Sequence, residues 1–404
     1  MRILAVAPVT PFPPSGGGHL RLHHLLRALA IHHEVTLVSF TYGEALEPAP
    51  FPIEVVTVPL ECSRLYKEMM YGDGPAAEEA YALLSRDTEP PFFVSYLESA
   101  EMENTLRQVG VRDWDLILII TTQMARFLPC LPNAPKILDL WNVEALVARR
   151  AAQAAPPDEA DRAAREADRM LRFERDAASQ CALCLAVSGP EAAAARRLLG
   201  ATRVRVVPNG VDTTQFTPDE GNPVPNRLLF VGTMNYSPNI EAARFFSRDV
   251  LPLIEEAVPG AELHIVGAKP TEEVRRLASQ QVIIHGGVPD MRPFYRHASV
   301  VVVPLLQGGG TRLKILEAAA CGKAIVSTAL GAEGLRLVPG RDLVIADSAR
   351  DFARAVIDLA QDGARCRELG RCARKATRAY DWRKIGVRVC RIVNAIPSTF
   401  REVS

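Results

Sequence analysis

The sequence predicts an α/β protein built of two doubly wound domains. At 404 residues the chain exceeds what one ordinary hydrophobic core holds, and two domains of about 200 residues each fit its length. In both halves, short apolar runs alternate with segments of helical pattern, which is typical of a parallel sheet with helices on both faces. Glycine-rich turns follow several of these runs, at the carboxyl ends of strands, where open α/β sheets bind ligands.

The first half opens with a strand, a glycine loop and a helix. The apolar run 3–7 predicts the strand, and Gly16, Gly17 and Gly18 form the loop. A helix over about 20–30 and a strand at 34–39 follow. A dinucleotide-binding GxGxxG turn would need a third glycine where Arg21 stands. The spacing therefore argues against a dinucleotide site.

The remaining elements continue the alternation. In the first half we expect a helix at 76–85, strands at 116–120 and 136–140, a charged helix at about 158–179 and a strand at 204–207. The segment 217–227 is rich in Pro, Gly and Asn, which predicts the linker between the domains. In the second half we expect strands at 228–232, 262–266, 282–285, 300–304 and 324–327, with helices near 239–253 and 272–279.

The segment 308–317 has the composition of a phosphate-binding turn. Three glycines, Gly308, Gly309 and Gly310, let the backbone approach a ligand, and the amides of a following helix attract negative charge. Lys314 adds a full positive charge. Glu317 lies about one turn further along the same helix face and suits the hydroxyls of a ribose. An anion site beside a hydroxyl acceptor indicates a nucleotide.

Two patterns that could hold a metal fit structural roles better. Asp113 and Asp115 stand at the polar start of the apolar strand 116–120. Cys181 and Cys184 form a single CxxC inside an apolar run, with no second pair and no His at ligand spacing. We therefore expect both cysteines in the core and no metal site.

Charge and hydropathy favour a cytoplasmic protein. Lys plus Arg equal Asp plus Glu at 47 each, so no net field attracts nucleic acid or an anionic membrane. The apolar start of the chain is too short for a signal peptide, and no apolar run is long enough to span a bilayer. The region 66–71 could still contact a lipid acceptor, which would make the protein peripheral to the inner membrane.

With these elements in order, the chain resembles the family 4 glycosyltransferases, also called glycosyl transferases group 1, over nearly its whole length. The matching pieces are the opening strand with Gly16 to Gly18, the strand end at Val187 and Ser188, the turn 207–212, Phe230-Val231-Gly232, His264-Ile265-Val266-Gly267, and the block 308–322. The resemblance implies retaining enzymes of the GT-B fold, in which two Rossmann-like domains face a cleft. It implies an acceptor-side domain of residues 1–215, with 382–404 crossing back onto it, and a donor-binding domain of residues 216–381.

The resemblance also assigns roles to residues of the donor site. Gly232 and Thr233 would flank the diphosphate, and Gly309, Gly310, Thr311 and Lys314 would hold it. Glu317 would bind the ribose, Gly286 would lie near the base, and Gly16, Gly17 and Gly18 would approach the diphosphate or the acceptor from the first domain. The cation and the fixed amides would stabilise the leaving nucleoside diphosphate, so no metal or other cofactor is expected.

Three positions depart from the family pattern. Gly309 stands where many relatives carry a Glu that contacts the donor sugar. Trp141 fills the place of a His after the fourth strand, so Asp139, Asn142 or Glu144 would act in its stead, beside Lys314, as catalytic residues. The Arg often found beyond the Gly232 turn is replaced by Thr233-Met234-Asn235, which leaves the phosphate charge to Lys314 and Arg312.

The function that follows is transfer of a sugar from a nucleoside diphosphate sugar to a polysaccharide, glycolipid or small-glycoside acceptor. Two alternatives stay open: a noncatalytic protein that binds sugar nucleotides, and an epimerase or phosphorylase of the same fold. A nicotinamide-dependent dehydrogenase is disfavoured by Arg21, which breaks the glycine spacing. Among the histidines, His19 follows the first glycine loop and could face a ligand or serve the fold.

Overall fold

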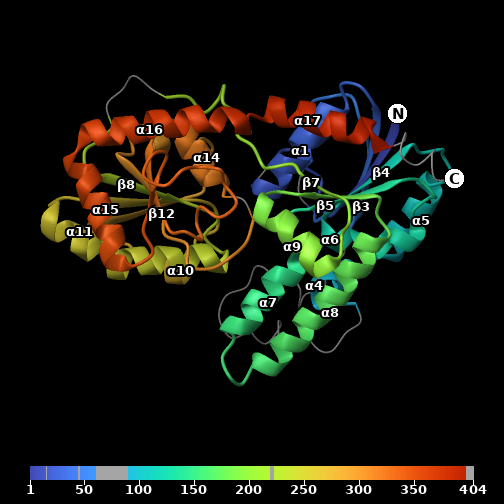
Figure 1. Cartoon of the computed structure of the whole chain (residues 1–404), viewed down its shortest axis with the longest axis horizontal. Helices are drawn as coiled ribbons and strands as arrows, with labels where there is room; N and C mark the ends of the chain where they lie inside the picture. The colour runs from blue at the N-terminus through green and yellow to red at the C-terminus, as the bar shows by residue number, and fades with distance from the viewer. Residues whose placement is uncertain (15, 44–45, 61–89, 219–222, 311, 397–404) are drawn as a thin grey trace. The chain divides into compact units, whose positions relative to one another are not determined.

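The computed structural model describes residues 1–14, 16–43, 46–60, 90–218, 223–310 and 312–396 (Figure 1). It forms two compact units. Unit 1 comprises Met1–Pro208 and Arg383–Ser404, and unit 2 comprises Asn209–Trp382. Each unit contains its own parallel sheet, as expected from the alternating pattern.

The sheet of unit 1 has the strand order β3-β2-β1-β4-β5-β6-β7, and every neighbouring pair is parallel. Its central strands are continuously apolar because helices cover both faces. All five residues of β4 are fully buried. The strands are β1 Arg2–Ala7, β2 Glu34–Thr41, β3 Glu54–Pro59, β4 Leu116–Ile120, β5 Lys136–Leu140, β6 Leu183–Ala186 and β7 Val204–Val206.

The helices of unit 1 include one from the far end of the described chain. They are α1 Gly17–Leu29, α4 Phe92–Ser95, α5 Ala100–Val109, α6 Thr121–Met124, α7 Glu144–Ala154, α8 Ala160–Ser179, α9 Gly189–Leu199 and α17 Trp382–Asn394, with a 3-10 helix at Ala125–Cys130. α17 lies against α1, where a Cβ on Gly386 would be 2.8 Å from Ala28 Cβ. It buries Ile385, Val389 and Val393. A large residue at 386 would therefore separate the two helices.

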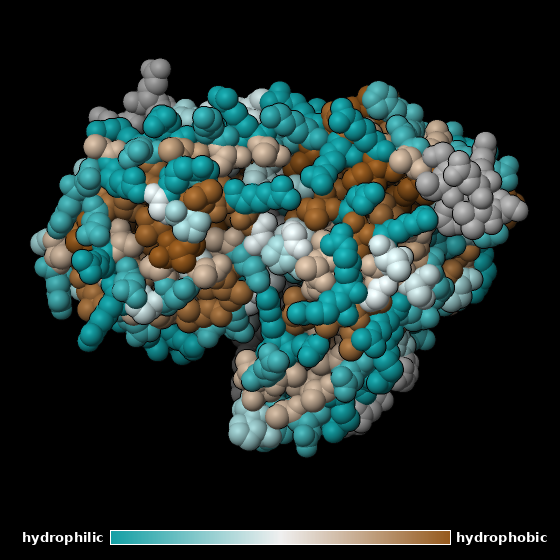
Figure 2. Space-filling model, in the orientation of Figure 1, coloured by the Kyte–Doolittle hydropathy of each residue, from teal (hydrophilic) through white to brown (hydrophobic). Residues whose placement is uncertain are grey.

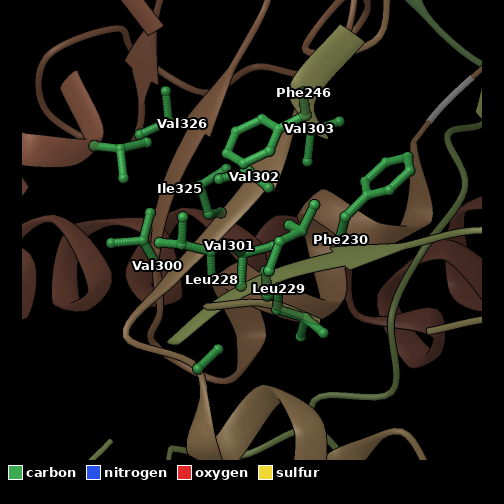
Figure 3. Packing of buried hydrophobic residues seen from close by; sticks show 14 of the residues in the cluster. Leu228, Leu229, Phe230, Phe246, Val300, Val301, Val302, Val303, Ile325 and Val326 are labelled. Atoms are coloured by element: carbon green, nitrogen blue, oxygen red, sulfur yellow. The ribbon is translucent and has the colours of Figure 1, made fainter. Parts of the chain in front are cut away.

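The sheet of unit 2 has the strand order β10-β9-β8-β11-β12-β13. β11 consists of four valines that are all fully buried, as suits a strand covered on both faces. Figure 3 shows Val300 to Val303 packed with Leu228, Phe230 and Phe246 in the core. The strands are β8 Arg227–Val231, β9 Glu262–Val266, β10 Val282–Gly286, β11 Val300–Val303, β12 Ala324–Ser327 and β13 Val344–Ile345.

The helices of unit 2 differ in places from the predicted ones. They are α10 Ser237–Phe245, α11 Leu251–Ala257, α12 Glu272–Arg275, α13 Arg292–His297, α14 Leu313–Ala320, α15 Ala349–Gln361 and α16 Gly363–Thr377, with a π-helix at Phe246–Val250 and a 3-10 helix at Arg378–Tyr380. The single helix expected at 239–253 is thus three segments, and Pro252, which cannot donate a backbone hydrogen bond, stands at the start of the third. The helix expected at 76–85 lies outside the described residues.

The units divide between Pro208 and Asn209, before the segment 217–227 that we expected to be the linker. Val211 explains this position, because it forms a bridge with Asp381 and its N–H donates to the Tyr380 carbonyl at 2.9 Å. Residues after Pro208 are therefore held by the end of unit 2. Among the described residues, no helix combines the length and the apolar character needed to cross a bilayer.

Candidate functional site

In unit 2, three glycines bring the carboxyl ends of β8, β9 and β10 together. The Gly232 N–H donates to the Val266 carbonyl at 3.1 Å, and the Gly267 N–H donates to the Gly286 carbonyl at 2.8 Å. A Cβ on Gly267 would lie 1.6 Å from the Gly232 carbonyl oxygen, so no side chain fits there. Gly286 has a φ of 68°, which favours glycine. The turns that follow the three strands are therefore packed backbone against backbone, with no side chain between Gly232 and Gly267.

Hydrogen bonds of Asn239 connect Lys314 to the turn that follows Gly232. The Lys314 Nζ donates to Asn239 Oδ1 at 2.8 Å, and Asn239 Nδ2 donates to the Thr233 carbonyl at 2.9 Å. The ammonium lies 4.6 Å from the centre of the Phe230 ring. Burial, with the repulsion of Arg312, lowers the pKa of Lys314 to about 7. A negative ligand beside Nζ would favour the charged form.

Glu317 lies on the next turn of α14 and is oriented by Tyr295 of α13. The fully buried Tyr295 hydroxyl donates to Glu317 Oε2 at 2.7 Å. Among the described residues, Oε1 has no hydrogen-bond partner. Burial raises the pKa of Glu317. One carboxylate oxygen is thus fixed by the protein, and the other can accept from a ligand hydroxyl.

The glycine turn 308–310 connects β11 to α14. Gly308 and Gly310 have φ values of 105° and 76°, so both need glycine. The Arg312 guanidinium donates to the Gly309 carbonyl and is almost fully buried, so it holds the turn in place. Thr311 lies outside the described residues. Among the described residues, no side chain caps the N-terminus of α14, so the amides of Leu313 and Lys314 can receive an anion.

In unit 1, the first glycine loop is shaped by Trp141. α1 begins at Gly17, and Gly16 precedes it with a φ of 90°. A Cβ on Gly18 would lie 2.2 Å from the Trp141 ring. Trp141 Nε1 is buried and has no hydrogen-bond partner among the described residues. Gly18 is therefore required by packing, whatever Gly16 and Gly17 contact.

Asp139, one of the predicted catalytic residues, lies in the core and is paired with Arg21. It is fully buried and accepts from Arg21 Nε at 2.9 Å and from Arg21 Nη2 at 2.5 Å. Arg21 Nη1 also donates to the Val207 carbonyl at 2.8 Å. Both oxygens of Asp139 are engaged by this ion pair. It also explains why an arginine stands at the third glycine position of the loop.

Asn142 and Glu144 lie together at the start of α7. Asn142 Nδ2 donates to Glu144 Oε1 at 3.2 Å. The buried Glu174 of α8 accepts from the amides of Glu144 and Ala145 at 2.9 and 2.8 Å and therefore caps α7. Burial, and then the charge of Glu174, raises the pKa of Glu144 to about 8. Glu144 is thus mostly protonated at neutral pH, which suits a proton donor better than a base.

The segment that contains the donor-site candidates resembles known proteins. Residues 225–362, which contain Gly232, Lys314 and Glu317, match the family model of glycosyl transferases group 1. A D-inositol 3-phosphate glycosyltransferase of Xylanimonas cellulosilytica is 33% identical over 46% of this chain and 50% of its own length. An uncharacterized protein in the cps region of Klebsiella pneumoniae is 28% identical over 33% of this chain and 37% of its own. The chain thus spans half or less of these curated relatives.

Solved structures match over almost the whole chain. Sucrose-phosphate synthase of Thermosynechococcus elongatus has a TM-score of 0.72 at 19% identity and covers 99% of this chain and 100% of its own. HepE of Anabaena, in complex with UDP and glucose, has a TM-score of 0.68 at 14% identity and covers 97% of this chain and 99% of its own. The chain has the GT-B fold. The expected fold class is confirmed.

Sequence reasoning missed three residues of these two GT-B units. Asn239 links Lys314 to the Gly232 turn, Tyr295 orients Glu317, and Glu174 caps α7. The only local signal for Asn239 is Pro238, which marks the first turn of a helix directly after a glycine turn. Tyr295 and Glu174 lie in ordinary helical patterns, and nothing in their neighbourhood distinguishes them.

Proposed function

We propose that this protein is a retaining glycosyltransferase that uses a nucleoside diphosphate sugar as its donor. The observation that carries the proposal is the cluster of Lys314, Asn239 and the Gly232 turn next to Glu317. A cation and free amides suit the diphosphate, and an oriented carboxylate suits the ribose. The match of residues 225–362 to glycosyl transferases group 1 supports this use of unit 2.

In the reaction, the bond between the anomeric carbon and the diphosphate oxygen breaks, and the diphosphate leaves with the electron pair. The acceptor hydroxyl oxygen forms the new bond, and its proton passes to the departing phosphate. Lys314 and the α14 amides stabilise the charge that develops on the leaving group. We assign Asp139 to positioning through Arg21, and we leave Glu144 and Asn142 as candidates for contact with the acceptor.

The acceptor, the compartment and the cofactor requirement are parts of the same proposal. Relatives that act on inositol phosphate and phosphatidyl-myo-inositol suggest a sugar or glycolipid acceptor. The described cysteines are all free thiols, which supports a reducing, cytoplasmic location. The positive charge of Lys314 makes a metal unnecessary for the leaving group, so turnover should persist in a chelator.

Calorimetric titration with UDP, GDP, ADP and NAD tests the donor site. We expect one nucleoside diphosphate to bind selectively, and Lys314→Ala to abolish that binding. Lys375→Ala is the matched control, because Lys375 is an exposed lysine of the same unit. Failure of all four nucleotides to bind the wild-type chain would overturn the donor site.

A noncatalytic sugar-nucleotide-binding protein is the second candidate. Two observations favour it: the Arg21 ion pair occupies Asp139, and Trp141 stands where a catalytic His was expected. Donor turnover separates the two candidates. Tight nucleotide binding with no release of nucleoside diphosphate from any donor, in the presence of acceptor extracts, would establish the noncatalytic function.

A further inference from the structure

Unit 1 carries an exposed basic face formed by residues that are not part of the donor site. α17 has four basic residues, Arg383, Lys384, Arg388 and Arg391, all exposed, and no acidic residue. Positions 384, 388 and 391 are separated by four and three residues, so they share one side of the helix. The whole chain has 47 basic and 47 acidic residues, and this face is therefore a local concentration of charge.

Three cations of this face are not neutralised by any described neighbour. Lys384, Arg388 and Arg391 have no acidic partner among the described residues. Some other exposed arginines of unit 1 form ion pairs, as Arg107 does with Glu103 and Arg112 does with Glu54. The charge of Lys384, Arg388 and Arg391 is therefore available for an external anion.

A groove continues the basic face at the end of α17. It has a volume of about 290 Å³, and its lining includes Ile392 of α17 and Ile396, which follows the helix. Three arginines also line the groove. Arg196 belongs to α9, Arg205 belongs to the edge strand β7, and Arg203 directly precedes that strand. Arg196 donates to the Val204 carbonyl at 3.1 Å. Arg203 and Arg205 are exposed and have no acidic partner among the described residues.

Apolar side chains lie among these cations. Val387 is 53% exposed and stands between Lys384 and Arg391 on the same side of α17. Figure 2 shows hydrophilic and hydrophobic atoms side by side along the outer side of this helix. The apolar face of α17 is buried, with Ile385, Val389 and Val393 in the core, so the outward side offers mainly cations. Clusters of Lys and Arg on an amphipathic helix are typical of sites that bind anionic lipid headgroups. Sites for single-stranded nucleic acid instead add aromatic platforms, and the outward residues of α17 provide none.

We propose that this face, formed by α17 and the β7 groove, docks the protein onto a bilayer surface that contains anionic phospholipids. The arginines of the groove and of α17 bind lipid phosphates, and Val387 reaches the boundary between headgroups and acyl chains. The inference goes beyond the proposed transferase activity, because docking requires neither donor nor acceptor.

Vesicle co-sedimentation of the full chain tests the proposal. One set of vesicles contains phosphatidylglycerol in phosphatidylcholine, and the other contains phosphatidylcholine alone. Two double variants, Arg388→Gln with Arg391→Gln and Arg203→Gln with Arg205→Gln, remove two charges each. The control is Arg350→Gln with Arg354→Gln, which removes two exposed arginines from α15 in unit 2.

We expect wild-type binding to anionic vesicles only, and loss of that binding at high salt. Each double variant of the face should lower the partition coefficient about tenfold or more, while the control stays unchanged. Equal binding to both kinds of vesicle, or an equal loss in the control, would overturn the proposal. Tighter retention on DNA than on anionic vesicles at the same salt would also overturn it, and would assign the face to a polyanion.

Nucleotide affinity, measured on the same variants, distinguishes failure of the docking proposal from failure of the proposed transferase function. Each variant should retain the unfolding temperature and the nucleotide affinity of the wild type, which shows that it is folded. Vesicle binding without any nucleotide binding would remove the transferase proposal and leave the docking surface intact. Nucleotide binding without vesicle binding would overturn the docking surface and leave the transferase proposal intact.

Discussion

Lys314 changes its charge near neutral pH, and this property can be measured. Burial lowers its pKa to about 7, and a bound diphosphate would favour the charged form. Nucleotide binding should therefore take up a proton, and affinity should fall as pH rises above about 7, by up to about tenfold per pH unit. Calorimetry in buffers of different ionisation enthalpy measures the uptake. Lys314→Arg stays charged and should lose this dependence, and a slope that persists in it would contradict the assignment.

Glu317 and Tyr295 should have effects of different size on nucleotide affinity. Glu317→Ala removes the acceptor for the ribose, and we expect a loss of roughly 1.5–3 kcal/mol, as for a hydrogen bond to a charged group. Tyr295→Phe leaves the carboxylate but removes its orienting hydrogen bond, so the loss should be smaller. Calorimetric titration of both variants with the preferred nucleotide measures the two losses. Unchanged affinity in Glu317→Ala would refute the ribose role.

Gly18 should tolerate no side chain while Trp141 is present. The Cβ of alanine at position 18 would overlap the Trp141 ring, so Gly18→Ala should lower the free energy of unfolding by about 1–3 kcal/mol, as other overpacking changes do. Addition of Trp141→Ala should recover part of the loss. Urea unfolding of the two single variants and the double variant gives the coupling. Purely additive losses would show that the contact is unimportant.

At the scale of elements, the buried pair of Glu144 and Glu174 at the start of α7 should make the free energy of unfolding depend on pH. The folded-state pKa of Glu144 is about 8, above its ordinary value of 4.5, because of burial and the charge of Glu174. The folded state therefore binds more protons than the unfolded state between these values. The stability that protonated Glu144 contributes is complete below pH 4.5 and is lost as pH rises to about 8.

Glu144→Gln should remove most of this dependence. The free energy of unfolding of the wild type should fall between pH 5 and pH 9. That of the variant should fall less, by on the order of 2 kcal/mol. Urea unfolding at the two pH values measures the difference. Glu101→Gln, which changes an exposed glutamate of α5, is the control and should leave the pH profile as it is.

The elements were largely predictable, and the contacts between distant elements were not. Strands such as β4 and β11 are short, continuous apolar runs rich in β-branched residues, and their length and composition indicate buried strands. The glycines 308 and 310 signalled a turn that needs positive φ, and the structure has it. The ion pair of Arg21 with Asp139 joins residues 118 positions apart, and the Lys314 bond to Asn239 spans 75. Local patterns carry no information on such partners, so the ion pair that engages both oxygens of Asp139 could not be predicted from the sequence.

At the scale of the whole molecule, nucleotide binding should protect the backbone amides of only one unit from hydrogen exchange. The donor cluster lies wholly in unit 2, between Gly232 and Glu317. Hydrogen exchange with the preferred nucleotide should slow at the turns after β8 and β10 and in α14, and should stay unchanged in β1 and β2. Protection confined to unit 1 would place the nucleotide elsewhere and contradict the donor site.

The position of α17 has a consequence for biosynthesis. Unit 2 is inserted between the main part of unit 1 and the helix that covers Ala28 of α1. A ribosome therefore releases the whole of unit 2 before it makes the helix that unit 1 still lacks. During that interval the apolar surface that receives Ile385, Val389 and Val393 stays uncovered. The first unit to emerge is thus the last to be completed, and it is the one that would depend on a chaperone.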